Sequence, residues 1–276
     1  MKMRKTIWIA LFGLFGMGLF SCENEPETPT DPLFEQQVFA VSEVMFQRFL
    51  MEINLSFFKG LSKNDLIGDI LLNPAEVDCA NTTYIWNPAA RTMTIDYGQS
   101  CTPSTGFRKS GKIVISMPSG SWTVGSSATL TFENLIMEQR KFEGSIKIDH
   151  GNIVFGATYR QTTSYQNLRF THEDNQVSTL SGNFSSQVNI GEVLTNFDIT
   201  GQGTGNYKGI GNFQTNVTAP LEYRLVCRDL GNNGFAKGVL ESTFAATNIQ
   251  TTPGTGPQCS ESLTIRIGDQ IRTIAF

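Results

Sequence analysis

The sequence contains very little histidine and little charge: two of its 276 residues are His, and 17% are charged. With 39% hydrophobic residues, so little charge excludes a disordered chain. The net charge of −4 leaves no basic excess, which argues against nucleic-acid binding. The G-x-S-x-G, H-E-x-x-H and P-loop patterns are all missing. We therefore expect neither an enzyme nor a bound cofactor.

The first 21 residues are typical of a lipoprotein signal peptide. Three basic residues in the first five precede an apolar stretch, Ile7 to Phe20. As a helix this stretch would span roughly 21 Å, short of the ~30 Å hydrocarbon core of a bilayer. Leu19-Phe20-Ser21-Cys22 matches a lipobox, which predicts cleavage before Cys22 and lipidation of its thiol. The alternative is an ordinary secretory signal that happens to end near a cysteine.

Lipidation would make the membrane a partner through the N-terminal lipid. Acyl chains, palmitate among them, contribute about 0.8 kcal/mol per buried CH₂, so two or three chains hold a protein firmly. Cleavage removes three basic residues and no acidic ones, which takes the net charge from −4 to −7. The protein should therefore be held by its lipid and not by attraction to anionic lipids.

Residues 22–32 form an acidic, proline-rich tether. After Cys22 this segment has three prolines, four acids and no apolar side chain, so it should stay extended over roughly 30 Å. Acidic residues directly after the lipidated cysteine resemble the surface-export signal of Bacteroidota lipoproteins. This resemblance implies an outer-membrane lipoprotein at the cell surface, and retention on the inner leaflet of that membrane is the alternative.

Residues 33–59 form the only long stretch with helical periodicity. Asp31 and Pro32 provide a cap and a first-turn proline, and Gly60 a stop. Polar residues lie off the apolar line, so we expect one face to pack on a broad sheet. A membrane-surface helix is the alternative, but it should be richer in Lys and Arg. The line follows i, i+3/i+4 spacing through Phe34, Val38, Val41, Met45 and Phe49.

From residue 82 the hydrophobic period changes to two. Alternating segments are separated by turn residues at intervals of 8–12, which indicates an antiparallel meander. The prediction is a mainly β fold, a sandwich, roll or barrel-like sheet with one N-terminal α-helix packed on it, as one domain over 33–276. The expected strand segments are 91–97, 112–117, 128–132, 142–148, 167–171, 184–188, 197–200, 213–217, 239–244 and 263–267. The expected turns include Gly98, Ser119-Gly120, Gly151-Asn152, Ser181-Gly182, Gly191 and Asn232-Asn233-Gly234.

Four cysteines follow Cys22, and an even number in an exported chain fits disulfides. Three connectivities are possible. We favour Cys79–Cys101 and Cys227–Cys259, because each pair is close in sequence and flanks strand segments. A metal site would need a C-x-x-C or Cys/His cluster, and the sequence has none.

The remaining candidates for chemistry have simpler structural interpretations. His150 and His172 are expected as exposed turn residues, and Gly201 to Asn206 as a glycine-rich hairpin. The segment from Asp229 to Gly234 has oxygen ligands suited to Ca²⁺ but too few acids, which favours a plain turn. A glycosidase would need a carboxylate pair, whereas acids on alternating strands ordinarily face solvent. The acids concerned are Asp96, Glu133, Glu138, Glu143 and Asp149.

Aromatic residues provide a weaker indication of binding. They could stack on sugars or line an apolar pocket, but most are expected in the core or in cross-strand pairs. The residues concerned are Trp86, Trp122, Tyr84, Tyr97, Tyr159, Tyr165 and Tyr207.

Several segments resemble a group of Bacteroidota lipoproteins of unassigned function. They are Thr94 to Cys101, Arg108 to Ile115, Pro220-Leu221 with Cys227, and the closing stretch Gly254 to Phe276. The group often has an acidic Cys-Asp-Asn step in its last turn, where this chain has Cys259-Ser260-Glu261. The resemblance covers roughly 79–276 and implies a lipid-anchored β protein of unassigned function; it transfers no catalytic residues to this chain.

These observations predict a lipid-anchored envelope lipoprotein whose β domain has a binding or structural role and no catalytic one. Its partner would be a protein, a glycan or an envelope assembly. The alternative is a carrier that encloses a lipid-like ligand in a rolled sheet, with the helix as a lid. A glycan-active hydrolase is the third hypothesis.

Overall fold

The computed structural model describes residues 33–66, 77–154, 158–189, 196–230, 234–254, 256 and 258–275. The predicted signal peptide, Cys22 and the tether lie outside these residues. Residues Leu33–Phe276 form one compact unit. Its elements are α1 (Phe34–Lys63), β1 (Thr83–Asn87), β2 (Thr92–Asp96), β3 (Lys109–Ser116), β4 (Ser127–Met137), β5 (Arg140–Glu143), β6 (Ser145–Val154), β7 (Thr158–Thr171), β8 (Val177–Asn189), β9 (Asn196–Tyr207), β10 (Gly211–Arg224), α2 (Leu225–Asp229), β11 (Phe235–Phe244), β12 (Thr247–Thr252), β13 (Ser262–Ile267) and β14 (Gln270–Ala275).

The strands form one antiparallel sheet of 14 strands in which neighbours in sequence are neighbours in space, as the alternating pattern predicts. β5 and β6 are separated only by Gly144, and both fill the place between β4 and β7. Gly144 has a φ of +113°, a conformation that a side chain would strain. In the described sheet β1 and β14 pair with one neighbour each and are its two edges.

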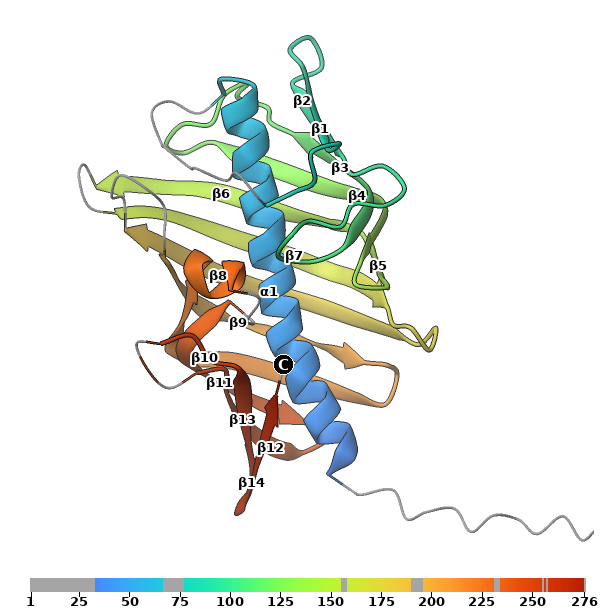
Figure 1. Ribbon diagram of the computed structural model, residues 1–276, viewed down its shortest axis with the longest axis vertical. Coiled ribbons are helices and arrows are strands. Elements are labelled where there is room, and N and C mark those ends of the chain that lie inside the picture. Colours follow the sequence, from blue (N-terminus) through green and yellow to red (C-terminus); the bar gives the residue numbers. More distant parts are fainter. Residues whose placement is uncertain are drawn as a thin grey trace, which may run out of the picture. The chain divides into compact units, whose positions relative to one another are not determined.

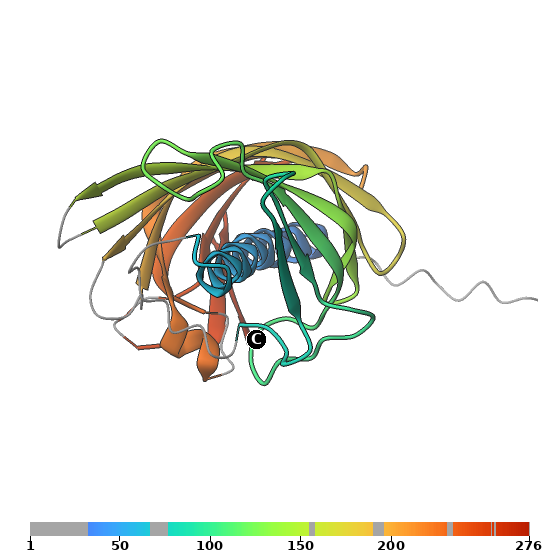
Figure 2. The same cartoon turned by 90° about the horizontal axis from the view of Figure 1, so that it is seen from above.

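The sheet curves around helix α1 (Figures 1 and 2). Its strands alternate between buried and exposed side chains, as β4 and β11 show. Apolar residues therefore face the helix, and polar residues face outwards. Of the architectures predicted from the sequence, a rolled sheet describes this arrangement best.

The second half of helix α1 is buried on every side and not on one face, whereas its first turn is partly exposed. Every residue from Phe49 to Leu61 is buried, which covers more than three helical turns. The predicted apolar line is therefore wrong as a description of the buried face: Phe34 is 55% exposed, whereas Gln47 is 1% exposed. The predicted end is also wrong, because Gly60 lies inside the helix and packs against Met93.

Aromatic contacts join α1 to the sheet along its length. Phe39 stacks on Phe244 of β11 with ring centroids 4.6 Å apart. Farther along, Phe49 stacks on Phe142 of β5 at 3.7 Å. Near the other end Phe58 meets Tyr159 of β7 edge-on at 5.5 Å. Each fully buried Phe side chain contributes about 1.5–3 kcal/mol, so these contacts fix the helix inside the sheet.

All ten strand segments predicted from alternation coincide with strands, but some predicted turns do not. Gly151 lies in β6 and Ser181-Gly182 in β8. The expected glycine-rich hairpin is the middle of β9, and the chain turns only after Tyr207. At Gly205 a side chain would collide with the Thr179 carbonyl and the Phe213 ring. The glycines therefore make room for large rings on the concave face. Gly191, Asn232 and Asn233 lie outside the described residues.

Candidate functional site

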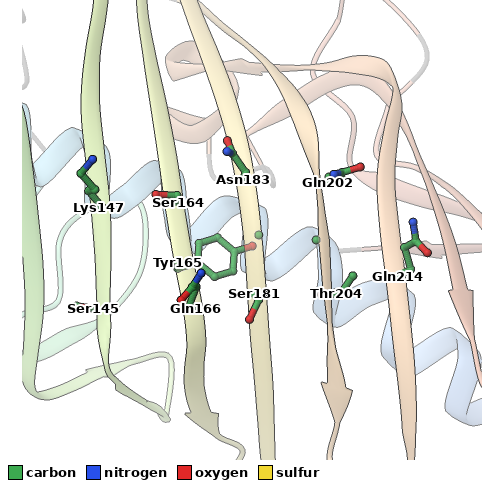
Figure 3. A pocket seen from close by; sticks show the side chains of 12 residues that line it. Ser145, Lys147, Ser164, Tyr165, Gln166, Ser181, Asn183, Gln202, Thr204 and Gln214 are labelled. Atoms are coloured by element: carbon green, nitrogen blue, oxygen red, sulfur yellow. The ribbon is translucent and has the colours of Figure 1, made fainter. Parts of the chain in front are cut away.

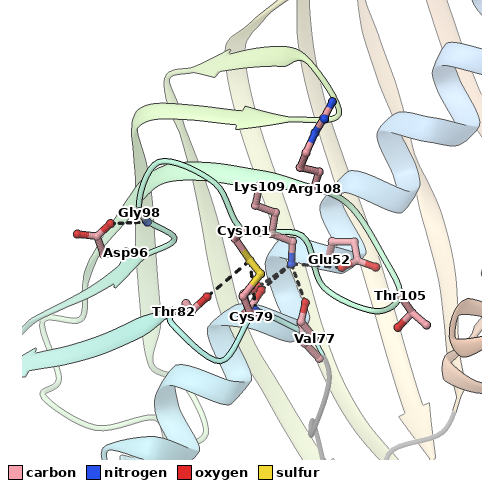
Figure 4. Close-up of a disulfide and its surroundings, with 12 residues drawn as sticks. Glu52, Val77, Cys79, Thr82, Asp96, Gly98, Cys101, Thr105, Arg108 and Lys109 are labelled. Carbon is pink, nitrogen blue, oxygen red and sulfur yellow. Dashed lines mark hydrogen bonds and ion pairs between the residues drawn. A yellow bond between two sulfur atoms is a disulfide. The ribbon is translucent and has the colours of Figure 1, made fainter.

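Four buried charged side chains meet between α1 and the sheet, and Figure 4 labels two of them, Glu52 and Lys109. Glu52 of α1 lies 3.3 Å from Lys109 Nζ of β3 and 2.7 Å from Arg228 Nε of α2. Lys109 Nζ also lies 2.6 Å from Asp78 Oδ1, just before β1. We call these four residues the charge network. It connects the helix to three other parts of the chain, each distant in sequence from the others.

The charge network is ionised and internally balanced. Burial alone would raise the pKa of Glu52, but Lys109 and Arg228 outweigh burial and hold that pKa below its ordinary value. Burial would likewise raise the pKa of Asp78, and Lys109 lowers it. Burial would lower the pKa of Arg228, but Glu52 raises it overall. Two carboxylates thus face two cations at neutral pH.

Hydrogen bonds occupy the donors of the charge network. Lys109 Nζ donates to the Val77 carbonyl at 3.0 Å, and Arg228 donates to the Thr105 hydroxyl at 2.9 Å. A general acid or base must exchange a proton near working pH and reach a substrate. All four groups are paired and buried, and the pKa values of Glu52, Asp78 and Arg228 are shifted in favour of their charged forms. The arrangement suits fixing the helix within the sheet.

Two disulfides brace the charge network. Cys79 is bonded to Cys101 and Cys227 to Cys259, as predicted from the spacing. Asp78 precedes Cys79, and Arg228 follows Cys227. Each disulfide therefore anchors a segment that contributes a charge. In the chain-entropy picture each cross-link adds about 2–4 kcal/mol.

The charge network is the feature that sequence reasoning missed. An isolated Glu in an apolar helix and a Lys in a strand look like solvent-facing residues. One signal was available: Glu52 and Asn54 interrupt the apolar run Phe49–Phe58 on different sides of the helix. A helix that is apolar almost all round must be buried, and a charge within it needs a partner.

A second carboxylate of α1, Glu43, is buried and has an uncharged hydrogen-bond partner. It accepts a 2.8 Å hydrogen bond from Thr215, which also pairs with Ser242 at 2.8 Å. Burial raises the pKa of Glu43 to about 7, and the Thr215 bond opposes this rise. Glu43 lies off the predicted apolar line, where a polar residue is expected to face solvent, yet it is only 5% exposed.

Both histidines are buried, so the prediction of exposed turn residues is wrong. His150 is 4% exposed, between the Trp122 and Tyr159 rings. His172 is 6% exposed, and its Nε2 lies 2.8 Å from Ser178 Oγ. Burial, reinforced by Lys208, lowers the pKa of His172 to about 4. Contacts with aromatic rings stabilise these neutral imidazoles. The position of a histidine next to an expected turn does not reveal such contacts.

The carboxylates considered for a glycosidase lie on the outer side of the sheet or at its turns. Asp96 pairs with Lys112 at 2.8 Å, and Asp149 pairs with Lys147 at 2.7 Å. Glu143 pairs with Lys141 at 2.8 Å. Glu133 is exposed, and Glu138 accepts a bond from the Arg108 backbone. Asp229 pairs with Arg228 at 2.9 Å.

The tyrosines and tryptophans belong to the core, as the simpler interpretation predicted. Five of the seven are buried, and Tyr84 and Trp86 pack against the core while partly exposed. Some form polar links as well: Trp122 Nε1 donates to Tyr159, which donates to Gln161, whose amide donates to Asn54 of α1. The buried five are Trp122, Tyr97, Tyr159, Tyr165 and Tyr207.

The outer face carries a shallow hollow of about 790 Å³ over β6 to β10 (Figure 3). We call it the outer groove. Lys147 is its only charged lining residue. Below it, the Tyr165 ring lies on the concave side of the sheet. The lining residues are Ser145, Lys147, Ser164, Tyr165, Gln166, Ser181, Gly182, Asn183, Gln202, Gly203, Thr204 and Gln214.

The outer groove has two rows of side chains (Figure 3). Ser164, Asn183 and Gln202 are direct cross-strand partners in one row. Ser181, Thr204 and Gln214 are partners in the other. Because alternate residues of a strand share a face, the two rows lie either side of Gly182 and Gly203. Amides and hydroxyls can donate and accept hydrogen bonds, so the outer groove can bind a polar ligand.

In the ranges that the structure describes, no three His, Cys, Asp or Glu side chains are grouped closely enough to hold a metal ion. Neither described helix is long and apolar enough to cross a membrane. Comparison with protein-family models, with curated proteins and with solved structures finds no match for this chain.

Proposed function

We propose that this chain is a lipid-anchored lipoprotein of the bacterial outer membrane, displayed at the cell surface, whose β domain binds a partner without catalysis. The lipobox at Cys22 and the acidic tether support the anchor and its location. The two disulfides fit an exported protein.

One observation supports binding on the outer face above all: helix α1 occupies the concave side of the sheet. A carrier needs room there for its ligand. The hollow found beside Phe46, Phe49 and Phe170 measures about 20 Å³, close to the space of a single water. The outer groove is about 790 Å³, within the range of ligand sites.

The arrangement of charged groups also favours binding over catalysis. The acids and cations of the charge network pair with one another, and three of the candidate acids, Asp96, Glu143 and Asp149, pair with neighbouring lysines. Catalytic sites instead hold groups with shifted pKa values in a cleft open to substrate. The outer groove has polar groups for recognition but no carboxylate or imidazole in its lining.

Metabolic labelling with an azide-bearing fatty acid tests the anchor. We expect the wild-type chain to be labelled and to sediment with membranes, and Cys22→Ser to lose both properties. Ser21→Thr, beside the same site, is the matched control and should keep both. An unlabelled wild-type chain, or a Cys22→Ser chain that stays with membranes, refutes the anchor.

Protease treatment of intact cells tests surface display. Loss of the protein without release of a periplasmic marker supports display, and full protection refutes it. Lipid extraction of the purified chain separates binding on the outer face from the carrier alternative. A stoichiometric lipid that remains bound to Cys22→Ser would favour the carrier.

A further inference from the structure

The outer groove does not end at β10. A second hollow, of about 460 Å³, lies on the same face of the sheet and includes Asn216, Glu241, Gln250 and Arg266 in its lining. Asn216 is the direct cross-strand partner of Gln202, which lines the outer groove. The two hollows are thus joined by hydrogen-bonded neighbours.

A single row of registered side chains crosses both hollows. Each member is the cross-strand partner of the next, from β6 to β13. With strands about 4.8 Å apart, seven steps give a track of roughly 34 Å. The members, which we call the polar row, are Lys147, Ser164, Asn183, Gln202, Asn216, Glu241, Gln250 and Arg266.

The chemistry of the polar row selects among partners. Its centre, Ser164 to Asn216, is uncharged, and its charges lie towards the ends. A polyanion such as a nucleic acid would need repeated cations along the track. A tight protein interface would need buried aromatic or Arg anchors, but the large rings of this sheet lie on the other face. An uncharged chain rich in hydroxyls matches amides and hydroxyls that both donate and accept.

We propose that the outer groove and the second hollow form one elongated site for a neutral polysaccharide lying across the strands. This inference rests on the proposed function, because it assumes that the outer face is the binding face. Ligand hydroxyls pair with the amides and hydroxyls of the polar row. The length of the row implies several sugar units bound at once.

Affinity electrophoresis of the full-length chain in detergent tests the ligand class. The probes are dextran, xylan and galactomannan, with polygalacturonate and heparin as charged polymers. We expect at least one neutral polymer to retard the chain. The variant Asn183→Ala/Gln202→Ala should weaken that binding about tenfold or more, and the control Asn212→Ala/Gln270→Ala, at exposed strand positions outside both hollows, should leave it unchanged. Retardation only by charged polymers, none at all, or equal loss in both variants overturns the proposal.

Chain length tests the joined site. Oligosaccharides of the retained polymer should bind more tightly as they lengthen, and Asn216→Ala/Gln250→Ala should weaken only the longer ones. Equal loss at every length, or no loss, refutes the joined site. Failure of this inference can be distinguished from failure of the proposed lipid anchor. A chain that is acylated and surface-exposed but binds no neutral polymer refutes only the polysaccharide site.

Discussion

Replacing Lys109 with methionine tests the charge network most directly. Methionine keeps much of the length of the side chain and removes its charge. Asp78 then loses its ion-pair partner, and Glu52 keeps Arg228 as its ion-pair partner. Removing one partner of a buried ion pair costs about 3–5 kcal/mol, because the other partner stays buried and unpaired.

The same strand supplies a matched control. Lys112 of β3 pairs with Asp96 at 2.8 Å, but both side chains are substantially exposed, at 48% and 29%. Exposed pairs contribute about 0–1 kcal/mol, so Lys112→Met should change the free energy of unfolding by no more than that. We therefore expect Lys109→Met to lower the free energy of unfolding by at least about 2 kcal/mol more than Lys112→Met does, although the two positions are three residues apart.

Equilibrium urea unfolding with the disulfides intact measures this difference. The fluorescence of Trp122, which is 3% exposed, reports loss of the core. Adding Asp78→Asn to Lys109→Met should recover part of the loss, because the uncompensated carboxylate is then gone. Equal losses for Lys109→Met and Lys112→Met, or a purely additive effect of Asp78→Asn, would refute the account of the charge network.

Three further predictions concern the interior. The pKa of Glu43 rises on folding to about 7, so the stability that its neutral form contributes is lost as pH rises from about 4.5 through 7, by about 3 kcal/mol in all. The pKa of His172 falls on folding and gives a slope of opposite sign over part of this range, so the test is the difference between wild type and Glu43→Gln in urea midpoints from pH 5 to pH 8, in which the His172 contribution cancels. A slope unchanged in the variant would contradict this origin. Removing one disulfide with Cys79→Ser/Cys101→Ser should cost about 2–4 kcal/mol in the same assay, and no loss would show that the cross-link contributes nothing. Gly205→Ala should cost about 1–3 kcal/mol by crowding the Phe213 ring, which melting by circular dichroism would detect, and an unchanged melting temperature would exclude that crowding.

Local sequence rules were sufficient for the disulfide pairs and for ten strand segments, but they gave no segment for β1, β12 or β14. Alternation over short segments depends only on which face of a strand is buried, and each cysteine pair is close in sequence. The meander joins neighbours in sequence, so few long-range choices remained open. The same rules missed what depends on distant partners. Glu52 and Arg228 are 176 residues apart, and no local pattern predicts their contact.

The helix shows where periodicity fails. The rule assumes one buried and one exposed face, whereas α1 has partners on all sides. Polar residues such as Gln47 and Asn54 then look exposed although they are buried. The outer groove also escaped prediction, because its residues have the ordinary composition of a solvent-facing sheet. Only their register across strands distinguishes them.

The position of α1 in the chain has a consequence for synthesis. The segment that ends up enclosed leaves the ribosome before any strand that encloses it. Its rings cannot leave water until β4 to β11, more than a hundred residues in all, have been made. Until then the apolar segment of α1 stays exposed to water, where it can aggregate or bind chaperones. The time needed to complete the later hairpins therefore sets how long the newborn chain is vulnerable.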